Sequence, residues 1–312
     1  MSALRARAED YLAMRRTLGF KLTTFGSRLM SFAGFCEERG ADRLTADLAL
    51  EWALQTSRGS TDEVYQARRL DVVRIFARHL QALDPSAEIP PDDVLSRRYR
   101  RIPPYLYSPE QIIALMSAAD SLAPAMRAAT WRTLIGLLAV TGMRQGEACR
   151  LGRDHADLQS GTLVIADSKF GKSRQVFLHP TATAALHAYE RARDQMFPEP
   201  KAATFLVNSR GSPLNEHNVQ HTFATLIAAA GIQAPPGRRA PRLHDLRHTF
   251  TVATMLDWYR DGANVQARLP LLSTWLGHVD PKSTYWYLQA IPELFTLAAG
   301  RLEPREQDGA AS

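Results

Sequence analysis

The chain has 312 residues, of which 45% are hydrophobic and 22% are charged, and its formal net charge is +6 at pH 7. These proportions exclude disordered, collagen-like and disulfide-scaffold chains, and the length suggests about two domains. The longest apolar stretch, residues 134–140, is far shorter than the roughly 18 residues that a membrane-spanning helix needs. We therefore expect a cytoplasmic protein with no membrane contact, whose positive charge favours a polyanionic partner.

The N-terminal part of the chain shows helical patterns only. Apolar side chains recur at helical spacing over residues 25–36, and Thr45 is placed to cap a short helix. Ser60 and Glu63 have the spacing of a capping box, which opens a further helix. These patterns predict a small helical domain over residues 1–90.

The segment after this domain has the composition of a linker. Five of the chain's 18 prolines lie between residues 84 and 104, and proline-rich segments of this kind connect domains. The same segment contains a basic run, Arg97, Arg98, Arg100 and Arg101. We predict a basic linker over residues 91–104, in which the run either binds phosphates or forms a solvated loop.

A second domain is predicted from residue 105 onward. Ser108 and Gln111 have the spacing of another capping box, and Pro109 is favoured at the first position of a helix. An apolar helix is predicted over residues 125–140, and Gly142 is placed to end it. Further helices are predicted to begin near residues 144, 181, 215, 244 and 291.

One segment of the second domain is typical of a sheet. Residues 162–165 and 174–178 are rich in apolar and β-branched residues, and they flank a turn that holds Lys169 and Lys172. This pattern predicts a β-hairpin with both lysines at its turn. The predicted fold class is therefore mainly α, with a small β-hairpin or sheet in the second domain.

Four separated fragments carry cationic or proton-transferring side chains near helix starts or at the hairpin turn. They are Arg144 with Glu147, three residues apart on one helix face; Lys169 with Lys172; His244 with Arg247; and Leu276-Gly277-His278, which precedes Tyr285 and Tyr287. This order, R…K…HxxR…LGH…Y, resembles that of the tyrosine recombinase (phage integrase) family. The resemblance extends from Tyr11 to about Leu302.

The resemblance implies a DNA strand-exchange enzyme of the two-domain type found in mobile elements. The two domains would clamp the duplex, with a SAM-like core DNA-binding domain at residues 1–90 and a catalytic domain at residues 105–303. The last helix of the catalytic domain would dock on a neighbouring protomer, and residues 304–312 would form a flexible tail.

The cationic residues suit phosphoryl transfer. Negative charge develops on the non-bridging oxygens of the phosphate, and Arg144 and Arg247 can hold those oxygens with permanently charged, bidentate contacts. The resemblance assigns the proton of the leaving 5′-oxygen to Lys169. Lys172 remains the competing candidate, because the exact register of a hairpin is poorly readable from sequence.

Other residues of the four fragments are predicted to assist. His244 and His278 can hydrogen-bond the phosphate oxygens and the attacking hydroxyl, and Glu147 can orient Arg144 or His244. His248, directly after Arg247, is interpreted as a packing residue.

Two tyrosines compete for the role of nucleophile. On a helix, positions 285 and 287 point about 200° apart, so only one of them can face the arginine pair. In the family that this chain resembles, the nucleophile lies nine residues after the histidine of Leu-Gly-His, and this spacing selects Tyr287. Tyr285 is then interpreted as a packing residue or a DNA contact.

Further basic residues are predicted to contact DNA: Arg97, Arg98, Arg100, Arg101, Lys172, Arg174, Arg238, Arg239 and Arg242. The implied partner is double-stranded DNA with paired recombination half-sites, bound by a homotetramer or a mixed recombinase assembly in the cytoplasm, associated with the nucleoid. No metal and no cofactor are expected, because a covalent phosphotyrosyl bond stores the energy of the cleaved bond.

The same residues leave other functions open. A type IB topoisomerase would use similar chemistry on one duplex, and a catalytically silent DNA-binding accessory protein would keep the fold and the charge. The i, i+4 pairs His244/His248 and His217/His221 could bind zinc, but neither contains the glutamate of an HExxH motif. A serine hydrolase is disfavoured because the sequence has no G-x-S-x-G elbow.

Overall fold

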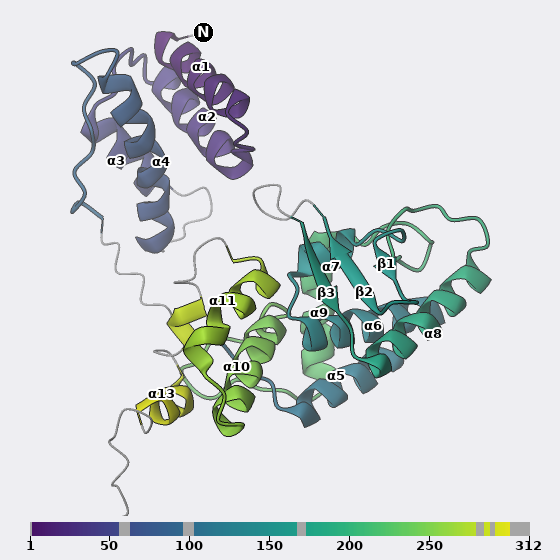
Figure 1. Cartoon of the computed structure of the whole chain (residues 1–312). Coiled ribbons are helices and arrows are strands. Elements are labelled where there is room, and N and C mark those ends of the chain that lie inside the picture. Colours follow the sequence, from purple (N-terminus) through teal and green to yellow (C-terminus); the bar gives the residue numbers. More distant parts are fainter. Residues whose placement is uncertain are drawn as a thin grey trace, which may run out of the picture. The chain divides into compact units, whose positions relative to one another are not determined.

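A computed structural model describes residues 2–55, 63–95, 103–166, 173–278, 284–287 and 291–299 (Figure 1). The predicted cap at Ser60, the basic run at residues 97–101 and both hairpin lysines, Lys169 and Lys172, lie outside the described residues. The chain divides into two compact units, Met1–Arg101 and Ile102–Ser312. No helix within the described ranges is both long enough and apolar enough to cross a bilayer.

The first unit is a small helical bundle. Its helices are α1 (Ala3–Thr17), α2 (Thr23–Glu38), α3 (Ala46–Leu54) and α4 (Glu63–Gln81). Helix α2 packs along α1, and α4 packs against both α2 and α3. Phe32, Trp52 and Phe76 are buried in its core, where the rings of Phe32 and Trp52 meet edge to face at 5.4 Å. Thr45 caps α3, as predicted, because its hydroxyl accepts the N–H of Leu48 at 3.3 Å.

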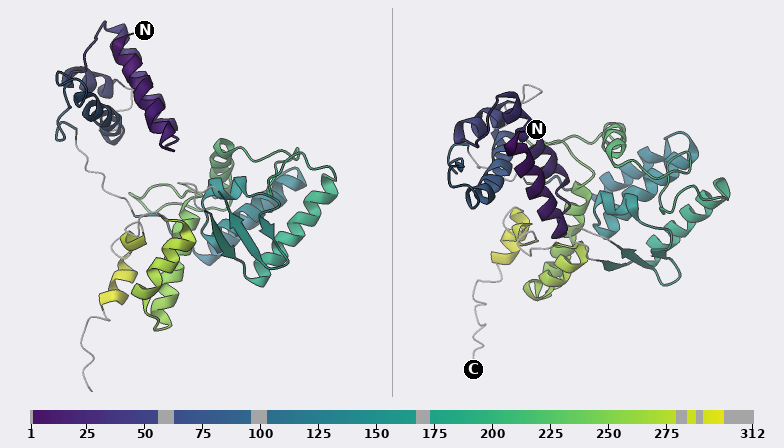
Figure 2. Two further views of the ribbon diagram at one scale, coloured as in Figure 1. Left: turned by 45° about the horizontal axis from the view of Figure 1, so that its top comes forward. Right: turned by 90° about the horizontal axis from the view of Figure 1, so that it is seen from above.

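The second unit contains most of the helices and the sheet. Its helices are α5 (Pro109–Asp120), α6 (Ala125–Thr141), α7 (Gln145–Arg150), α8 (Pro180–Met196), α9 (Glu216–Ala229), α10 (Asp245–Arg260), α11 (Val265–Leu276) and α13 (Pro292–Ala299). Residues 284–287 are also helical. Figures 1 and 2 show the sheet toward one side of this unit and α13, in yellow, toward the other. The mainly helical fold with a small sheet confirms the predicted fold class.

The sheet has three antiparallel strands in the order β1 (Ala156–Asp157), β2 (Thr162–Ile165) and β3 (Arg174–Phe177). The β2–β3 hairpin agrees with the sequence pattern, whereas the two-residue β1 is too short to produce a periodic signal. Leu163, Ile165 and Val176 are buried, so one face of the sheet covers the core. Ile165 pairs with Arg174 at the end of the hairpin that leads to the turn.

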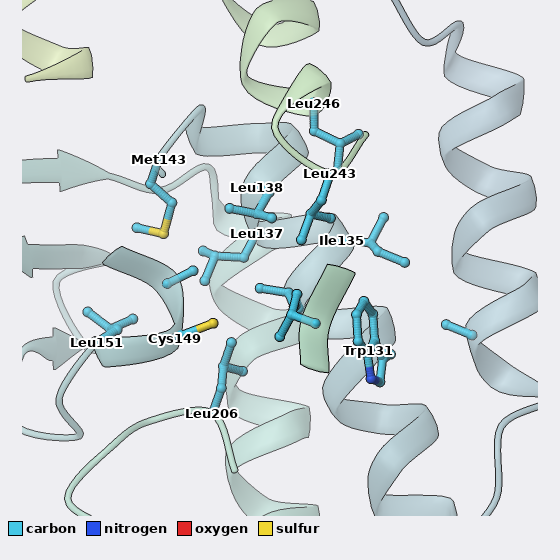
Figure 3. Packing of buried hydrophobic residues seen from close by; sticks show 14 of the residues in the cluster. Trp131, Ile135, Leu137, Leu138, Met143, Cys149, Leu151, Leu206, Leu243 and Leu246 are labelled. Atoms are coloured by element: carbon cyan, nitrogen blue, oxygen red, sulfur yellow. The ribbon is translucent and has the colours of Figure 1, made fainter. Parts of the chain in front are cut away.

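Helix α6 is the centre of the second unit. It packs against α5, α7, α8 and α10, and its buried side chains include Trp131, Ile135 and Leu138. Most of the helix is buried, and Arg132 and Val140 mark its exposed side. Figure 3 shows these side chains with Cys149 of α7 and Leu246 of α10, so one core holds the two helices next to which Arg144 and His244 lie.

A separate cluster lies around the C-terminal helices. Met255 of α10, Leu272 of α11, Leu294 of α13 and Tyr287 are buried together. Helix α13 therefore packs on α10 of its own chain, and its docking on a neighbouring protomer remains a prediction.

The junction between α6 and α7 depends on Gly142, which ends α6 with a φ of +63°. This left-handed conformation costs residues with a side chain about 1–2 kcal/mol. A Cβ at this position would also overlap the ring of Phe250 on α10. Gly142 therefore meets both a backbone and a packing requirement.

We expect Gly142→Ala to reduce the free energy of unfolding by about 2–5 kcal/mol, the sum of the backbone cost and about 1–3 kcal/mol for overpacking. Gly231→Ala is the matched control, because Gly231 also has a positive φ, +66°, but nothing lies within 4 Å of a Cβ built there. Urea unfolding followed by circular dichroism measures both variants. Equal losses in the two variants would contradict the packing role of Gly142.

Candidate active site

Glu147 is the shared acceptor of two arginines. It lies on α7 with only 5% of its side chain exposed. Arg174, at the start of β3, donates from Nη1 to Oε1 at 3.1 Å and from Nη2 to Oε2 at 2.7 Å. Arg144 donates its Nη1 to Oε1 at 2.7 Å and its backbone N–H to Oε2 at 2.8 Å. The carboxylate therefore joins the start of α7 to the hairpin.

The structure corrects the expectation for Arg174. Its position beside the hairpin lysines favours a DNA contact, but its side chain is 8% exposed and is engaged by Glu147. The two residues are 27 positions apart in the chain, so no local pattern indicates the pair. Arg174 is thus an internal partner of the site in this structure.

Three arginines bind successive carbonyl oxygens at the C-terminal end of α11. Arg174, Arg247 and Arg144 donate to the carbonyls of residues 275, 276 and 277, at 2.6, 2.7 and 2.9 Å respectively. The last carbonyls of a helix lack partners within the helix and form the negative end of its dipole, so cations stabilise them. His278 follows directly, which places it beside all three guanidinium groups.

Arg247 is the most deeply buried of these cations, with 3% of the residue exposed. Besides the α11 carbonyl it binds the carbonyl of Gly142 at 2.7 Å. Burial, followed by the charge of Arg144, lowers its pKa to about 9, so it remains charged at pH 7. Each terminal nitrogen of a guanidinium carries two N–H groups, so a side chain that binds one carbonyl can also bind a phosphate oxygen.

The charge of Glu147 balances part of this positive cluster. Burial alone would raise its pKa, but hydrogen bonds from the Arg174 side chain and the Arg144 backbone, with the charge of Arg174, lower the pKa to about 2. The carboxylate is therefore ionised at any working pH, and it keeps two guanidinium groups close together.

His244 and His278 are neutral partners in the site. Burial and then the charge of Arg247 lower the pKa of each to about 4. The Nδ1 atom of His278 is hydrogen-bonded to the hydroxyl of Thr284 at 2.8 Å, and Thr284 in turn contacts Ser273 at 2.7 Å. Because neutral imidazole has one donor and one acceptor nitrogen, both histidines suit hydrogen bonding to a substrate.

The structure separates the two candidate tyrosines. Tyr285 is 44% exposed, whereas Tyr287 is 3% exposed and lies in the cluster with α10 and α11. The Tyr287 hydroxyl is hydrogen-bonded to Nδ1 of His248. His248 is thus a site residue that the sequence analysis interpreted as packing, although its i+4 spacing from His244 places both on one helix face. Their rings lie 4.9 Å apart, edge to face.

Basic side chains also surround the start of α10. Arg239 and Arg242 lie 3.8 and 3.7 Å from Oδ1 of Asp245, a buried carboxylate whose Oδ2 accepts the N–H of Arg242 at 2.8 Å. Arg238 and Arg239 are exposed. The contacts with Asp245 hold Arg239 and Arg242 near His244. DNA contact by Arg238, Arg239 and Arg242 stays a prediction.

The predicted catalytic residues within the described ranges converge. The charges of Arg144 and Arg247 both act on His278, and Arg247 also interacts with Tyr287. His244 interacts electrostatically with both arginines. These residues come from α10, the start of α7, the end of α11 and residues 284–287, so only the folded chain brings them together.

Comparisons with known proteins agree with this arrangement. A model of the phage integrase family matches residues 106–293. The chain is 40% identical over 314 residues to an integrase/recombinase homologue, y4rB of Sinorhizobium fredii, with 99% of each chain covered. It is 29% identical over 260 residues to the tyrosine recombinase XerC of Bacillus subtilis, with 78% of this chain and 79% of the relative covered.

The chain belongs to the phage integrase family. Solved structures of tyrosine recombinases share the fold of this integrase family member at low sequence identity. The Tn1549 transposon integrase in complex with transposon right end DNA matches with a TM-score of 0.67 and 16% identity over 97% of this chain and 98% of that one. A lambda integrase tetramer bound to a Holliday junction matches with a TM-score of 0.60 and 18% identity over 89% and 77%.

The buried pair of Glu147 and Arg174 supports a stability prediction for this integrase family member. Removing one partner of a buried ion pair costs about 3–5 kcal/mol, so we expect Glu147→Gln to lose about 3 kcal/mol of unfolding free energy at pH 7. The pKa of Glu147 is about 2 in the folded state against an ordinary value of 4.5. Its contribution is therefore complete above about pH 5 and is lost as pH falls toward 2. In urea unfolding, the difference in unfolding free energy between the unaltered protein and Glu147→Gln should be similar at pH 7 and 5 and smaller at pH 3.

Glu51→Gln is the control for this experiment. Glu51 pairs with Arg39, but both side chains are more than 40% exposed, and exposed pairs contribute about 1 kcal/mol or less. A loss of similar size in both variants, or a gap for Glu147→Gln that does not change with pH, would contradict the proposed charge balance.

Proposed function

We propose that this tyrosine recombinase cleaves and rejoins double-stranded DNA through a 3′-phosphotyrosyl intermediate on Tyr287, in the integration or transposition of mobile DNA. The observation that carries the proposal is the cluster of Arg144, Arg247, His244 and His278, in which Arg247 interacts with the buried Tyr287. Tyrosine attack conserves the energy of the phosphodiester bond in a covalent bond, so the reaction needs no nucleotide cofactor.

Arg144 and Arg247 are proposed to bind the non-bridging oxygens of the scissile phosphate. Their side chains are held by backbone carbonyls and, for Arg144, by Glu147. Donors that are fixed before the reaction stabilise developing negative charge without reorganising during it. His244 and His278, which are neutral at pH 7, can each donate one further hydrogen bond to these oxygens.

Lys169 is proposed as the general acid for the leaving 5′-oxygen, with Lys172 as the alternative. Both belong to the connection between β2 and β3, and Arg174 anchors the β3 end of this hairpin to Glu147 and to α11. Arg174 thereby holds the β3 end of the hairpin in the arginine cluster, which supports a lysine of this connection as the general acid.

The proposed substrate is a duplex with paired half-sites, bound by a homotetramer or a mixed recombinase assembly. The two units would clamp the DNA, and the basic linker together with Arg238, Arg239 and Arg242 would contact phosphates. The solved relatives bound to transposon end DNA and to a Holliday junction support this proposal through their shared fold.

Substitution of the two tyrosines tests the nucleophile. Tyr287→Phe should bind DNA normally, because many other cations supply the affinity, but should form no covalent adduct. Tyr285→Phe should still form one. The substrate is a nicked suicide duplex whose sequence is selected from a random pool by binding to the protein, and adducts are measured on denaturing gels and by peptide mass.

Each other outcome of this experiment has a defined meaning. An adduct on Tyr285 would overturn the assignment of Tyr287. No adduct with the unaltered protein would indicate a DNA-binding accessory role. Adducts accompanied by supercoil relaxation, but not by exchange between two sites, would indicate topoisomerase-like chemistry.

A sulfur leaving group tests the general acid. Loss of general acid catalysis should slow cleavage of ordinary DNA by about 100-fold or more, so we expect this loss in Lys169→Ala. Replacing the bridging 5′-oxygen with sulfur should restore the activity of that variant, because a thiolate leaves without a proton. Lys172→Ala is the control and should cleave ordinary DNA. The opposite pattern would transfer the role to Lys172.

A further inference from the structure

His248 contacts the atom that is proposed to attack the phosphate. Its Nδ1 atom is hydrogen-bonded to the Tyr287 hydroxyl, and the two rings lie 5.5 Å apart. The ring of Trp286 is also near, with its centroid 6.5 Å from that of the His248 ring. The imidazole is thus held between α10 and the helical segment 284–287.

Neighbouring side chains fix the place of this imidazole. Arg247, the preceding residue, is anchored to the carbonyls of Gly142 and Leu276. The ring of His244, one turn earlier, meets the His248 ring edge to face at 4.9 Å. Because its helix is held at this point, His248 presents Nδ1 to Tyr287 in a fixed direction.

We infer that His248 is a catalytic residue whose Nδ1 accepts the proton of the Tyr287 hydroxyl during attack, an inference that rests on the proposed function. As the Oη–P bond forms, the Oη–H bond breaks and its proton moves to Nδ1. The P–O5′ bond breaks, and the leaving oxygen takes a proton from the general acid. In rejoining, the incoming 5′-hydroxyl gives its proton to the deprotonated general acid as the new P–O5′ bond forms. The imidazolium returns its proton to the Tyr287 oxygen as the phosphotyrosyl bond breaks.

The surroundings of His248 keep its imidazole unprotonated until DNA binds. Burial, followed by electrostatic interactions with His244 and Arg247, lowers its pKa to about 3, so the ring is neutral before DNA binds. Arg242 and Arg239, from the loop before α10, act in the same direction. A bound phosphodiester brings negative charge against these arginines, and this charge raises the basicity of the imidazole at the moment of attack.

His248→Asn separates proton transfer from positioning. The side-chain oxygen of asparagine can accept a hydrogen bond near the position of Nδ1, but an amide cannot take up the proton. We expect the single-turnover rate of adduct formation to fall by about 100-fold or more, the usual contribution of general acid–base catalysis, while DNA affinity is retained. His248→Ala should lose a similar amount and recover part of it in added imidazole.

Two results would overturn this inference. The first is that His248→Asn forms the adduct at a rate near that of the unaltered protein. The second is that His248→Ala folds and binds DNA but does not form the adduct faster in added imidazole. The adduct of the unaltered protein is measured first, because its absence would reject the proposed function instead. Tyr287→Phe in added imidazole is the background control.

The tautomer of His248 provides a test that needs no loss of activity. If the Tyr287 hydroxyl donates to Nδ1, the ring proton must reside on Nε2. Nitrogen-15 NMR of protein with labelled histidines should show that Nδ1 of His248 is unprotonated. The His248 resonance is assigned by comparison with His248→Asn or, if that variant does not fold, with Tyr287→Phe. A protonated Nδ1 would mean that His248 donates to the tyrosine, which contradicts its role as a base.

Discussion

The site depends on the C-terminal end of α11, where three arginines bind three successive carbonyl oxygens. These arginines come from β3, from α10 and from the residue before α7, so one helix end connects the sheet to α10 and to the start of α7. A helix terminus suits this purpose because its last carbonyls need donors from elsewhere. The same contacts orient Arg144 and Arg247, and they fix the position of His278, which leaves the helix at this point. The proposed phosphate site is therefore assembled on the end of a helix.

Such a concentration of cations requires a counter-charge, and Glu147 supplies it. The carboxylate accepts hydrogen bonds from two guanidinium groups and one backbone N–H, so much of the repulsion between Arg144 and Arg174 is offset within the protein. The balance is incomplete, because Arg247 also lies in the cluster. Positive charge is left over where the proposed phosphate binds, and the pKa values of His244, His248 and His278 are all lowered by burial and by these charges. Glu147 thus stabilises the folded state, while the positive charge that it does not offset favours binding of the proposed phosphate.

The local parts of this structure could be predicted from the sequence, and its long-range parts could not. The caps at Thr45 and Ser108, the stop at Gly142 and the β2–β3 hairpin follow from short patterns that specify backbone geometry. Helix α11 also begins at a cap, Asn264, and ends at Gly277, but Pro270 inside it argues against one continuous helix. The order of the motifs indicates the family, and it predicts the side chains of the candidate site. The roles of Arg174 and His248 depend on partners 27 and 39 residues away. The i, i+4 spacing from His244 places His248 on the same helix face, but neither this spacing nor the position of Arg174 beside the hairpin reveals those partners.

The burial of Tyr287 links the fold to the timing of the proposed chemistry. A phenol is a weak nucleophile at neutral pH because its pKa is near 10, so attack requires an acceptor for its proton. Neutral imidazole at His248 meets this need only weakly while the surrounding arginines are unneutralised. A phosphodiester in the site would offset those charges and, at the same time, present the electrophile to the tyrosine. Substrate binding would then create both the target of attack and the basicity that attack needs, and the tyrosine would remain a protonated, hydrogen-bonded core residue until DNA is in place.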